Sequence, residues 1–456
     1  REIAHILGYV AAVSSDEIEK FTRKVMLKFV YDRKIDDFFV PNCYPIKDNF
    51  YDDISSYIKE TGKEPIVHPL FRDLQNEKFL IDDVEKDFIY PVEQFGAIDK
   101  LIGEEKEYEE YCFLNHIRKS SLDKIKNNNG KIVVLSLEES RIELHSIIFL
   151  HKKLDEYNID KIYYITGNNW STYDNYKLWC ENKGLEIKVV MINSNEQLYL
   201  KGQDLYKNHG TFVNADELDN KREKRFLCFN RRIRPHRYAM IAMFHHNNLL
   251  KNNLVSYSLE RGKDLNHLGQ NGPDLHTMTT IMGKTILRDS YMSYYNELVE
   301  LSPMTIDYEN LTNIMGPGHE NKEPYSKTYF SIVTETPFPE RNYFSSEKIF
   351  RPMIQYHPFI VYGSPFTLKS LRELGFKTFS PFIDESYDET ISPFRRMQKI
   401  TKEIKRLCSM SDTEMHKWFL SMKDILVYNR NLMYEYGKKY EESQMKIFKD
   451  INDELS

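Results

Sequence analysis

The sequence predicts an α/β protein of two domains, each built on a parallel β-sheet, followed by a helical C-terminal tail. The chain has 456 residues, more than one hydrophobic core usually serves. Short β-rich apolar runs alternate with helix-length segments, an order typical of parallel sheets with helices on both faces. This alternation occurs twice, and the charged segment 214–225 separates the two occurrences. We therefore place one domain at 1–220 and the other at 221–456.

The first domain shows the alternation in its second half. Lys131–Leu135 is an apolar run of strand length, and apolar residues then recur at helical spacing over 144–154. Two more runs of strand length follow at 162–165 and 187–192. Residues 1–120 mix helical periodicity with short apolar patches and contain no recognisable motif, so the sequence assigns them no role.

The second domain begins the pattern again. Its expected strands are 226–229, 254–258, 329–333, 359–362 and 376–379. A helix over 237–250 is expected after the first of these strands. The helix after Tyr362 has clear boundary signals, because Ser364 can act as N-cap, Pro365 suits the first helical position and Gly375 follows the last turn.

The C-terminal tail has the periodicity of amphipathic helices. Met397, Ile400 and Ile404 lie on one stripe, and Ser411 with Glu414 forms the pattern of a capping box before the next helix. In contrast, residues 262–325 are weakly periodic, and we interpret them as an insertion that serves as a lid or acceptor loop.

Composition excludes several classes of function. The chain is 41% hydrophobic and 29% charged, as globular proteins are, and its net charge of −6 gives no general attraction to nucleic acids. The five scattered cysteines favour a reducing compartment, so we expect a cytoplasmic location. We expect no transmembrane segment, since no apolar run reaches about 18 residues and no signal-like segment opens the chain. The chain begins at Arg1, so a native leader or another domain can precede it.

A dense polar cluster occupies the turn between the first strand and helix of the second domain. It runs from Phe229 to Arg237 and includes Asn230, Arg231 and Arg234. Ligands bind outside the carboxyl ends of parallel strands, helix N-termini attract anions, and arginine offers a fork of donors to phosphate oxygens. The cluster predicts a diphosphate clamp. A solvated basic helix start is the alternative.

A second cluster follows the strand that ends at Val333. Glu335 comes directly after this strand, and Ser346, Glu347 and Lys348 open the next helix. A carboxylate there can accept hydrogen bonds from ribose hydroxyls, while the serine, the free amides and the lysine can bind phosphate. The alternative is an ordinary helix cap.

Two later residues of this helix also bear on the prediction. Arg351 lies one turn further on and adds another cation that can reach phosphate. Pro352 should kink the helix.

The order of these segments resembles the α-1,3-fucosyltransferase family and its relatives among the GT-B glycosyltransferases, which have two Rossmann-like domains. The segments that carry the resemblance are Phe226–Asn230 with Arg237, Phe330–Thr336, Phe344–Lys348 and Pro358–Ser364. The resemblance implies that Arg237 and Lys348 hold the diphosphate of the donor. It also implies that Glu347 holds the ribose and that Glu335 lies near the donor sugar.

The resemblance further implies the reaction. A GDP- or UDP-linked sugar would serve as substrate and pass its sugar to a glycan or another hydroxyl acceptor, with inversion and with no cofactor. The last helices would return to the first domain. Two departures leave the sugar and the acceptor open: Phe344 replaces a tyrosine of the family, and residues 259–325 do not match.

An inverting transfer needs a base that takes the proton of the acceptor hydroxyl. Glu138 and Glu139 directly follow the strand 131–135 at the edge that would form the cleft, with His145 nearby and Glu93 as a further candidate. Solvated loop acids are the alternative for both glutamates.

No metal site is expected from the sequence. No Asp-x-Asp stands near a strand end, and the paired acids at 36–37, 52–53 and 82–83 fall in the motif-poor region, where such pairs are usually solvated. The neighbouring His245 and His246 point in different directions on a helix and are expected at the surface.

Other functions lack their usual markers. The sequence contains no Gly-x-Gly-x-x-Gly, Walker Gly-Lys-Ser/Thr or Gly-x-Ser-x-Gly motif. A transferase of another activated group, such as sulfate, would need a loop signature that is missing. The rival from a different class is a non-catalytic nucleotide- or glycan-binding module that has kept the cleft and lost the base.

Overall fold

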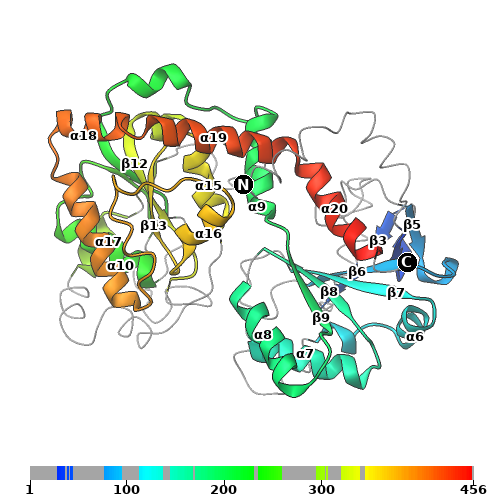
Figure 1. Cartoon of the computed structure of the whole chain (residues 1–456). Helices are drawn as coiled ribbons and strands as arrows, with labels where there is room; N and C mark the ends of the chain where they lie inside the picture. The colour runs from blue at the N-terminus through cyan, green and yellow to red at the C-terminus, as the bar shows by residue number, and fades with distance from the viewer. Residues whose placement is uncertain are drawn as a thin grey trace. The chain divides into compact units, whose positions relative to one another are not determined.

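The computed structural model describes residues 28–35, 38–40, 42–44, 77–94, 112–136, 144–167, 170–230, 235–258, 294–302, 304–306, 320–338 and 345–453. The chain forms two compact units. One comprises residues 1–166, 171–194 and 441–456, and the other comprises 167–170 and 195–440. Each unit contains a parallel sheet with helices on it, which confirms the predicted α/β class with two Rossmann-like units and a helical C-terminal tail (Figure 1).

The first unit is built on a seven-stranded sheet with the order β5-β1-β6-β7-β8-β9 and with β4 beside β6. All of its pairings are parallel. Its strands are β1 (Lys28–Tyr31), β4 (Cys43–Tyr44), β5 (Glu77–Leu80), β6 (Phe88–Gln94), β7 (Gly130–Ser136), β8 (Ile162–Thr166) and β9 (Val189–Asn193). The last three confirm the predicted strands, whereas β1, β5 and β6 lie in the region to which the sequence assigned no role.

The remaining elements of the first unit are short strands and helices. β2 (Arg33–Ile35) and β3 (Phe38–Val40) form an antiparallel pair. The helices among its described residues are α6 (Lys119–Asn127), α7 (Leu144–Glu156), α8 (Trp170–Lys183) and α20 (Tyr440–Asp453), with 3-10 turns at Ile81–Asp83 and Phe113–Asn115. The expected return of the tail is confirmed, because Phe448 of α20 packs edge-on against Phe29 of β1 at 5.4 Å between ring centroids.

The second unit is built on a four-stranded parallel sheet with the order β11-β10-β12-β13. Its strands are β10 (Lys224–Cys228), β11 (Leu254–Val255), β12 (Thr328–Thr334) and β13 (Phe359–Tyr362). The chain passes from β10 outward to β11, whereas it passes from β12 outward to β13 on the other side. The gap between β10 and β12 is therefore a topological switch point, the place where open α/β sheets bind ligands.

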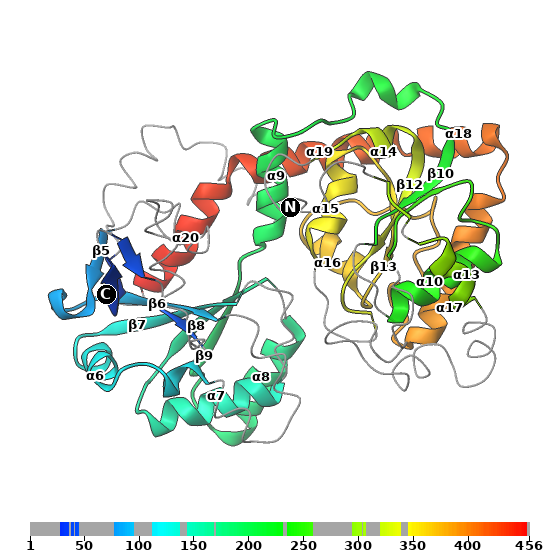
Figure 2. The same cartoon turned by 180° about the vertical axis from the view of Figure 1, so that it is seen from behind.

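Helices cover both faces of this sheet. α15 (Glu347–Ile354) and α16 (Thr367–Glu373) lie on one side, and α10 (Pro235–His246) and α17 (Pro393–Cys408) lie on the other (Figures 1 and 2). The structure describes five more helices in this unit, α9 (Glu196–Tyr206), α13 (Tyr295–Glu300), α14 (Glu323–Ser326), α18 (Asp412–Leu420) and α19 (Lys423–Lys438), with a 3-10 turn at Ala215–Asp219.

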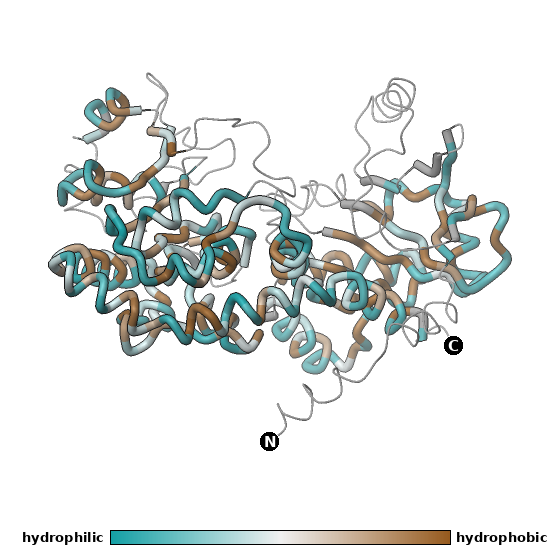
Figure 3. The backbone as a smooth tube through the Cα atoms, turned by 90° about the horizontal axis from the view of Figure 1, so that it is seen from above, coloured by the Kyte–Doolittle hydropathy of each residue, from teal (hydrophilic) through white to brown (hydrophobic). Residues whose placement is uncertain are grey.

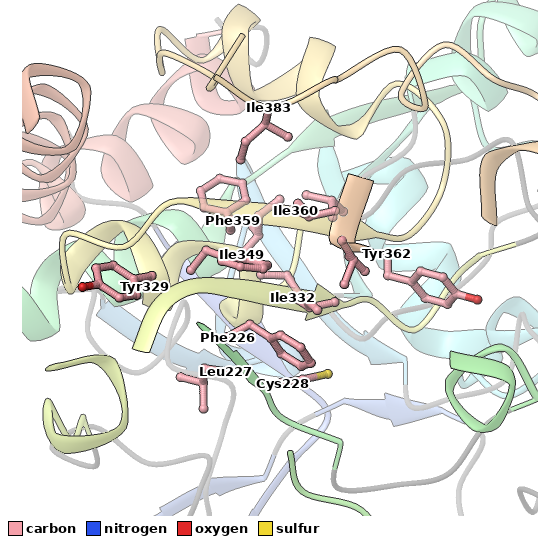
Figure 4. Packing of buried hydrophobic residues seen from close by; sticks show 14 of the residues in the cluster. Phe226, Leu227, Cys228, Tyr329, Ile332, Ile349, Phe359, Ile360, Tyr362 and Ile383 are labelled. Carbon is pink, nitrogen blue, oxygen red and sulfur yellow. The ribbon is translucent and has the colours of Figure 1, made fainter. Parts of the chain in front are cut away.

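The core of the second unit forms between this sheet and its helices. All seven residues of β12 are buried. Phe226, Ile332, Ile349 and Phe359 pack together around the strands (Figure 4), and each such side chain contributes about 1.5–3 kcal/mol by leaving water. Brown and teal alternate along the helical parts of the tube in Figure 3, as expected of helices with one buried face.

Several predicted boundaries of the tail helices are confirmed. The stripe of α17, which includes Met397, Ile400 and Ile404, is buried. Ser411 and Glu414 form the predicted capping box of α18. Among the helices that the structure describes, none is long and apolar enough to span a bilayer.

The change of unit occurs at residues 194–195 and not at the predicted position near 220. α9 belongs to the second unit because it packs along α19 (Figures 1 and 2). The two helices meet at Gly202 and Gly437 so closely that a Cβ atom on Gly437 would lie 2.0 Å from the carbonyl of Gly202. The charged segment 214–225 forms a capped 3-10 turn and the start of β10, so it is no linker.

Two further predictions are wrong. Residues 376–379 form no strand, since their amide groups are used elsewhere: Lys377 N donates to Asn429 and Phe379 N donates to Glu385. Ser364 is not the N-cap of α16, which begins at Thr367 after a left-handed residue, Phe366.

Candidate functional site

Asn230 joins the carboxyl ends of three strands at the switch point. Thr334 Oγ1, at the end of β12, donates to Asn230 Oδ1 at 2.8 Å. The amide N–H of Asn230 donates to Ser256 Oγ beyond β11 at 3.1 Å, and its Nδ2 donates to Cys228 Sγ of β10 at 3.3 Å. Asn230 is buried. Asn230, a predicted site residue, therefore lies at the switch point and links the ends of the strands around it by hydrogen bonds.

The first turn of α10 reaches across the switch point to the end of β12. Arg237 Nη2 donates to the carbonyl of Thr334 at 3.0 Å, and His236 Nε2 donates to the carbonyl of Glu335 at 2.9 Å. Both side chains are buried. The predicted cation Arg237 thus lies next to Asn230 and Glu335, on the side of the switch point that α10 covers.

Glu335 connects β12, β13 and α15. Its carboxylate accepts hydrogen bonds from Ser346 Oγ at 2.7 Å and from Ser346 N at 3.2 Å. Its own amide donates to the carbonyl of Tyr362 at 3.1 Å. Gly363 packs closely here, since a Cβ atom at this position would lie 3.1 Å from the Cβ atom of Glu335. Glu335 is a buried carboxylate that fixes the start of α15 against the sheet.

The first turn of α15 has the predicted cap. Ser346 is the N-cap, and its Oγ accepts from Lys348 N at 3.2 Å. Lys348 Nζ donates to the same oxygen at 3.2 Å and lies 3.1 Å from Glu347 Oε1. Burial acts to raise the pKa of Glu347, but the charges of Lys348 and Arg351 outweigh it and hold the pKa below its ordinary value. Glu347 is therefore ionised at neutral pH.

Arg351 takes part in a buried cluster of charges. Its Nε lies 3.4 Å from Glu320 Oε1, which also accepts from Lys201 Nζ at 2.9 Å. Lys201 in turn donates to Asp204 at 2.8 Å. Burial acts to lower the pKa of Arg351, and Glu320 and its neighbours raise it overall. Arg351 thereby ties α15 to α9, an interaction that the sequence did not indicate.

The start of α16 is closed by an acidic side chain of the protein itself. Asp388 accepts from Leu368 N at 2.8 Å and from Lys369 N at 3.0 Å. These are amides of the first turn, which would otherwise attract an external anion. The helix starts of α10 and α15 are consequently the ones that flank the switch point with basic side chains, Arg237 and Lys348.

An aromatic stack beside the switch point was not predicted from the sequence. The rings of His236, Phe338 and Tyr362 stack on one another, with centroids 4.4 Å apart for Phe338 and Tyr362 and 5.3 Å apart for His236 and Phe338. His236 lies inside the basic cluster of the sequence, but its partners are remote in the chain. Only the folded sheet brings the three together.

Arg396 holds this stack in place from α17. Its guanidinium lies over the Phe338 ring at 4.7 Å and donates to the carbonyl of that residue. It also donates to the carbonyls of Gly363 at 3.0 Å and Thr390 at 2.8 Å. Arg396 is buried. No local pattern marked it, because its partners are backbone carbonyls of distant loops.

The first unit has its own switch point between β1 and β6, and Asp32 follows β1 there. Its carboxylate accepts from Tyr90 Oη at 2.8 Å and from Ser121 Oγ at 2.7 Å. The sequence analysis did not select Asp32, since β1 was not predicted. Asp32 is a carboxylate at the edge of the first sheet where ligands of such folds bind.

Several predicted residues lie outside the part of the chain that the structure describes. They are Glu138, Glu139, Arg231, Arg234 and Phe344. The side chain of Glu93 is likewise outside it, and His145 is exposed on α7. The catalytic roles predicted for Glu138 and Glu139 stay predictions.

His245 and His246 both contact α13. His245 Nε2 lies 2.7 Å from Glu297 Oε2, and His246 Nδ1 lies 2.7 Å from Tyr294 Oη. The two histidines bond different partners, consistent with their different directions on α10. Over the described ranges, no three histidine, cysteine, aspartate or glutamate side chains gather as a possible metal site.

The site thus combines two chemical environments. Two helix starts with Arg237 and Lys348 provide positive charge on both sides of the switch point, which suits a diphosphate. Glu347 provides an ionised acceptor beside Lys348. Comparison with known proteins found no match to this chain among family models, curated proteins or solved structures.

Proposed function

We propose that this chain is a glycosyltransferase that binds a nucleotide-diphosphate sugar at the carboxyl edge of its second sheet and passes the sugar to a glycan or another hydroxyl acceptor. The observation that carries the proposal is the position of Arg237 and Lys348 in the first turns of the two helices that follow β10 and β12, the strands on either side of one topological switch point. Open α/β sheets bind ligands at such points, and this one carries fixed cations suited to a diphosphate.

The diphosphate is the leaving group, and it gains negative charge as the bond to the sugar breaks. Preorganised cations and helix-end amides stabilise such charge without reorganisation during the reaction. In our proposal Arg237, Lys348 and Arg231 supply this stabilisation, so the transfer needs no divalent metal. The ionised carboxylate of Glu347 accepts hydrogen bonds from the two hydroxyls of the donor ribose.

The acceptor hydroxyl must lose its proton as it attacks the sugar. We propose Glu138 and Glu139, which follow β7 in the sequence, as candidates for this base, and Asp32, which follows β1, as a third. A single displacement of this kind inverts the anomeric centre. Replacing the true base with its amide should depress turnover strongly and leave donor affinity nearly unchanged, which Glu138→Gln, Glu139→Gln and Asp32→Asn can decide.

The test is calorimetric titration of the chain with GDP- and UDP-linked sugars, followed by an assay of donor hydrolysis and transfer. Binding with turnover that survives exhaustive chelation supports the proposal. Binding without any turnover would favour the second candidate, a nucleotide- or glycan-binding module that has lost its base. Activity that disappears with chelator and returns with Mg²⁺ or Mn²⁺ would contradict the role of the fixed cations.

A further inference from the structure

Two buried hydroxyl groups at the carboxyl end of β13 have no hydrogen-bond partner among the described residues. They are Tyr362 Oη and Ser364 Oγ. Tyr362 is 0% exposed and Ser364 is 4% exposed, so water does not supply the missing bonds freely. Burial raises the pKa of Tyr362, and its hydroxyl therefore keeps its proton as a donor. Each group carries both donor and acceptor capacity that none of the described residues uses.

Such groups are costly, because a buried polar atom that loses its bonds to water destabilises the fold. Two polar groups close by are paired. Tyr387 Oη, also buried, accepts from Val361 N at 3.1 Å. Even the carbonyl of Ser364 accepts from Thr367 Oγ1 at 2.8 Å. Ser345 Oγ, just before α15, is likewise buried without a partner among the described residues, so the unpaired hydroxyls gather at the carboxyl end of β13 and the start of α15.

Hydrogen bonds and ring contacts hold the residues that carry these hydroxyls in place. The carbonyl of Tyr362 accepts from Glu335 N, and its ring stacks on Phe338 and on His236 at 6.0 Å. Arg396 holds the carbonyl of Gly363, which lies between the two residues. In Figure 4 the hydroxyl of Tyr362 points away from the hydrophobic cluster, at the opposite end of the sheet from the hydroxyl of Tyr329. It lies on the edge that carries Glu335 and Arg237.

We propose that Tyr362 and Ser364 are specificity residues whose hydroxyls bind hydroxyl groups of the transferred sugar. This inference rests on the proposed function. A sugar hydroxyl both donates and accepts, so it matches a tyrosine and a serine, whereas the charged groups that suit phosphate lie on α10 and α15. Sites built to bond a substrate hydroxyl discriminate strongly against analogues that lack it, because the buried protein group is then left unpaired.

The experiment uses Tyr362→Phe and Ser364→Ala in the whole chain. The probes are the GDP- or UDP-sugar that the parent binds best, its deoxy-sugar analogues, and the matching nucleoside diphosphate. We expect each variant to bind the nucleotide sugar about 3- to 10-fold more weakly, the effect of one neutral hydrogen bond. Affinity for the nucleoside diphosphate should not change, and thermal stability should be equal to or above that of the parent.

Tyr387→Phe is the matched control, because it also removes a buried tyrosine hydroxyl near β13, but one that is bonded. It should lower thermal stability and leave sugar-nucleotide affinity intact. Equal nucleotide-sugar affinity in the parent, Tyr362→Phe and Ser364→Ala overturns this inference while the proposed function stands. Equal losses for the nucleotide sugar and the free nucleotide overturn the assignment to the sugar. Failure of the parent to bind any nucleotide sugar overturns the proposed function itself.

Discussion

His357 lies two residues before β13 and Tyr362 is its last residue, and both are 0% exposed, yet their polar atoms differ in hydrogen bonding. His357 Nδ1 accepts from Ser331 Oγ at 2.7 Å, and its Nε2 donates to the carbonyl of Thr328 at 2.6 Å. Both ring nitrogens are satisfied, whereas the hydroxyl of Tyr362 has no partner within the described chain. The comparison teaches that the polar atoms of His357 serve the fold, whereas the hydroxyl of Tyr362 is the one that our inference assigns to a ligand.

The largest effect expected from this comparison is a loss of stability in acid. Burial lowers the pKa of His357 to about 3, helped by the charge of Arg222 and opposed by the bond to Thr328. The unfolded chain takes up this proton near pH 6.5, so stability is full above that pH and falls as pH drops toward 3. A pKa difference is worth about 1.36 kcal/mol per unit. The full loss in the free energy of unfolding, reached below pH 3, is therefore roughly 4–5 kcal/mol.

Urea unfolding of the parent and of His357→Gln, at pH 7.5 and pH 5.5, measures this effect. Over this range the parent should lose about 1 kcal/mol more of its free energy of unfolding than the variant. If the free energy of unfolding changed with pH equally in parent and variant, His357 would be already protonated or exposed in the folded protein. The contrast between a satisfied His357 and an unpaired Tyr362 would then be wrong.

A smaller effect is expected from the cations at the carboxyl edge. Lys348→Ala and Arg237→Ala each remove a charge-assisted contact to the donor, so nucleotide-sugar affinity should fall by about 1.5–3 kcal/mol. Lys369→Ala is the matched control, because Lys369 is an exposed cation at the start of α16, where Asp388 already occupies the helix end. Unchanged nucleotide affinity in both well-folded site variants would remove the diphosphate clamp from the account.

The smallest effect concerns Glu347. Its carboxylate is ionised because Lys348 and Arg351 hold its pKa low against burial. Glu347→Gln keeps the shape and removes the charge, which should cost about 1 kcal/mol of preference for ribonucleotides over deoxyribonucleotides. The check is the ratio of the two dissociation constants in parent and variant; an identical ratio would make Glu347 a helix-cap acid alone.

Local patterns predicted much of the fold. β12 and α15 were predictable because an unbroken apolar run and a serine cap act within a few residues. The domain boundary was not predictable, because the charged residues of 214–225 pair with residues far away in the sequence. Glu217 pairs with Lys322 at 2.7 Å, and Asp219 pairs with Lys423 at 2.8 Å. A charged segment looks like a linker when its partners are remote.

The site residues were likewise predictable only where their role follows from their position beside a strand or helix end. Asn230, Arg237 and Glu335 were found because they directly follow strands or open a helix, and the sheet brings them together. Ser364 was misread as a cap because Asp388, from another loop, takes that role. Arg396 escaped notice because it bonds backbone carbonyls, which leave no mark in a sequence.

The central claim is that the carboxyl edge of the second sheet binds a nucleotide sugar through Arg237 and Lys348. Calorimetric titration of the parent chain and of Lys348→Ala with a panel of GDP- and UDP-sugars tests it most directly. The account predicts that at least one nucleotide sugar binds the parent and that the variant binds it about 10-fold or more weakly. Absence of binding to every member of the panel, or equal affinity in parent and variant, would contradict it.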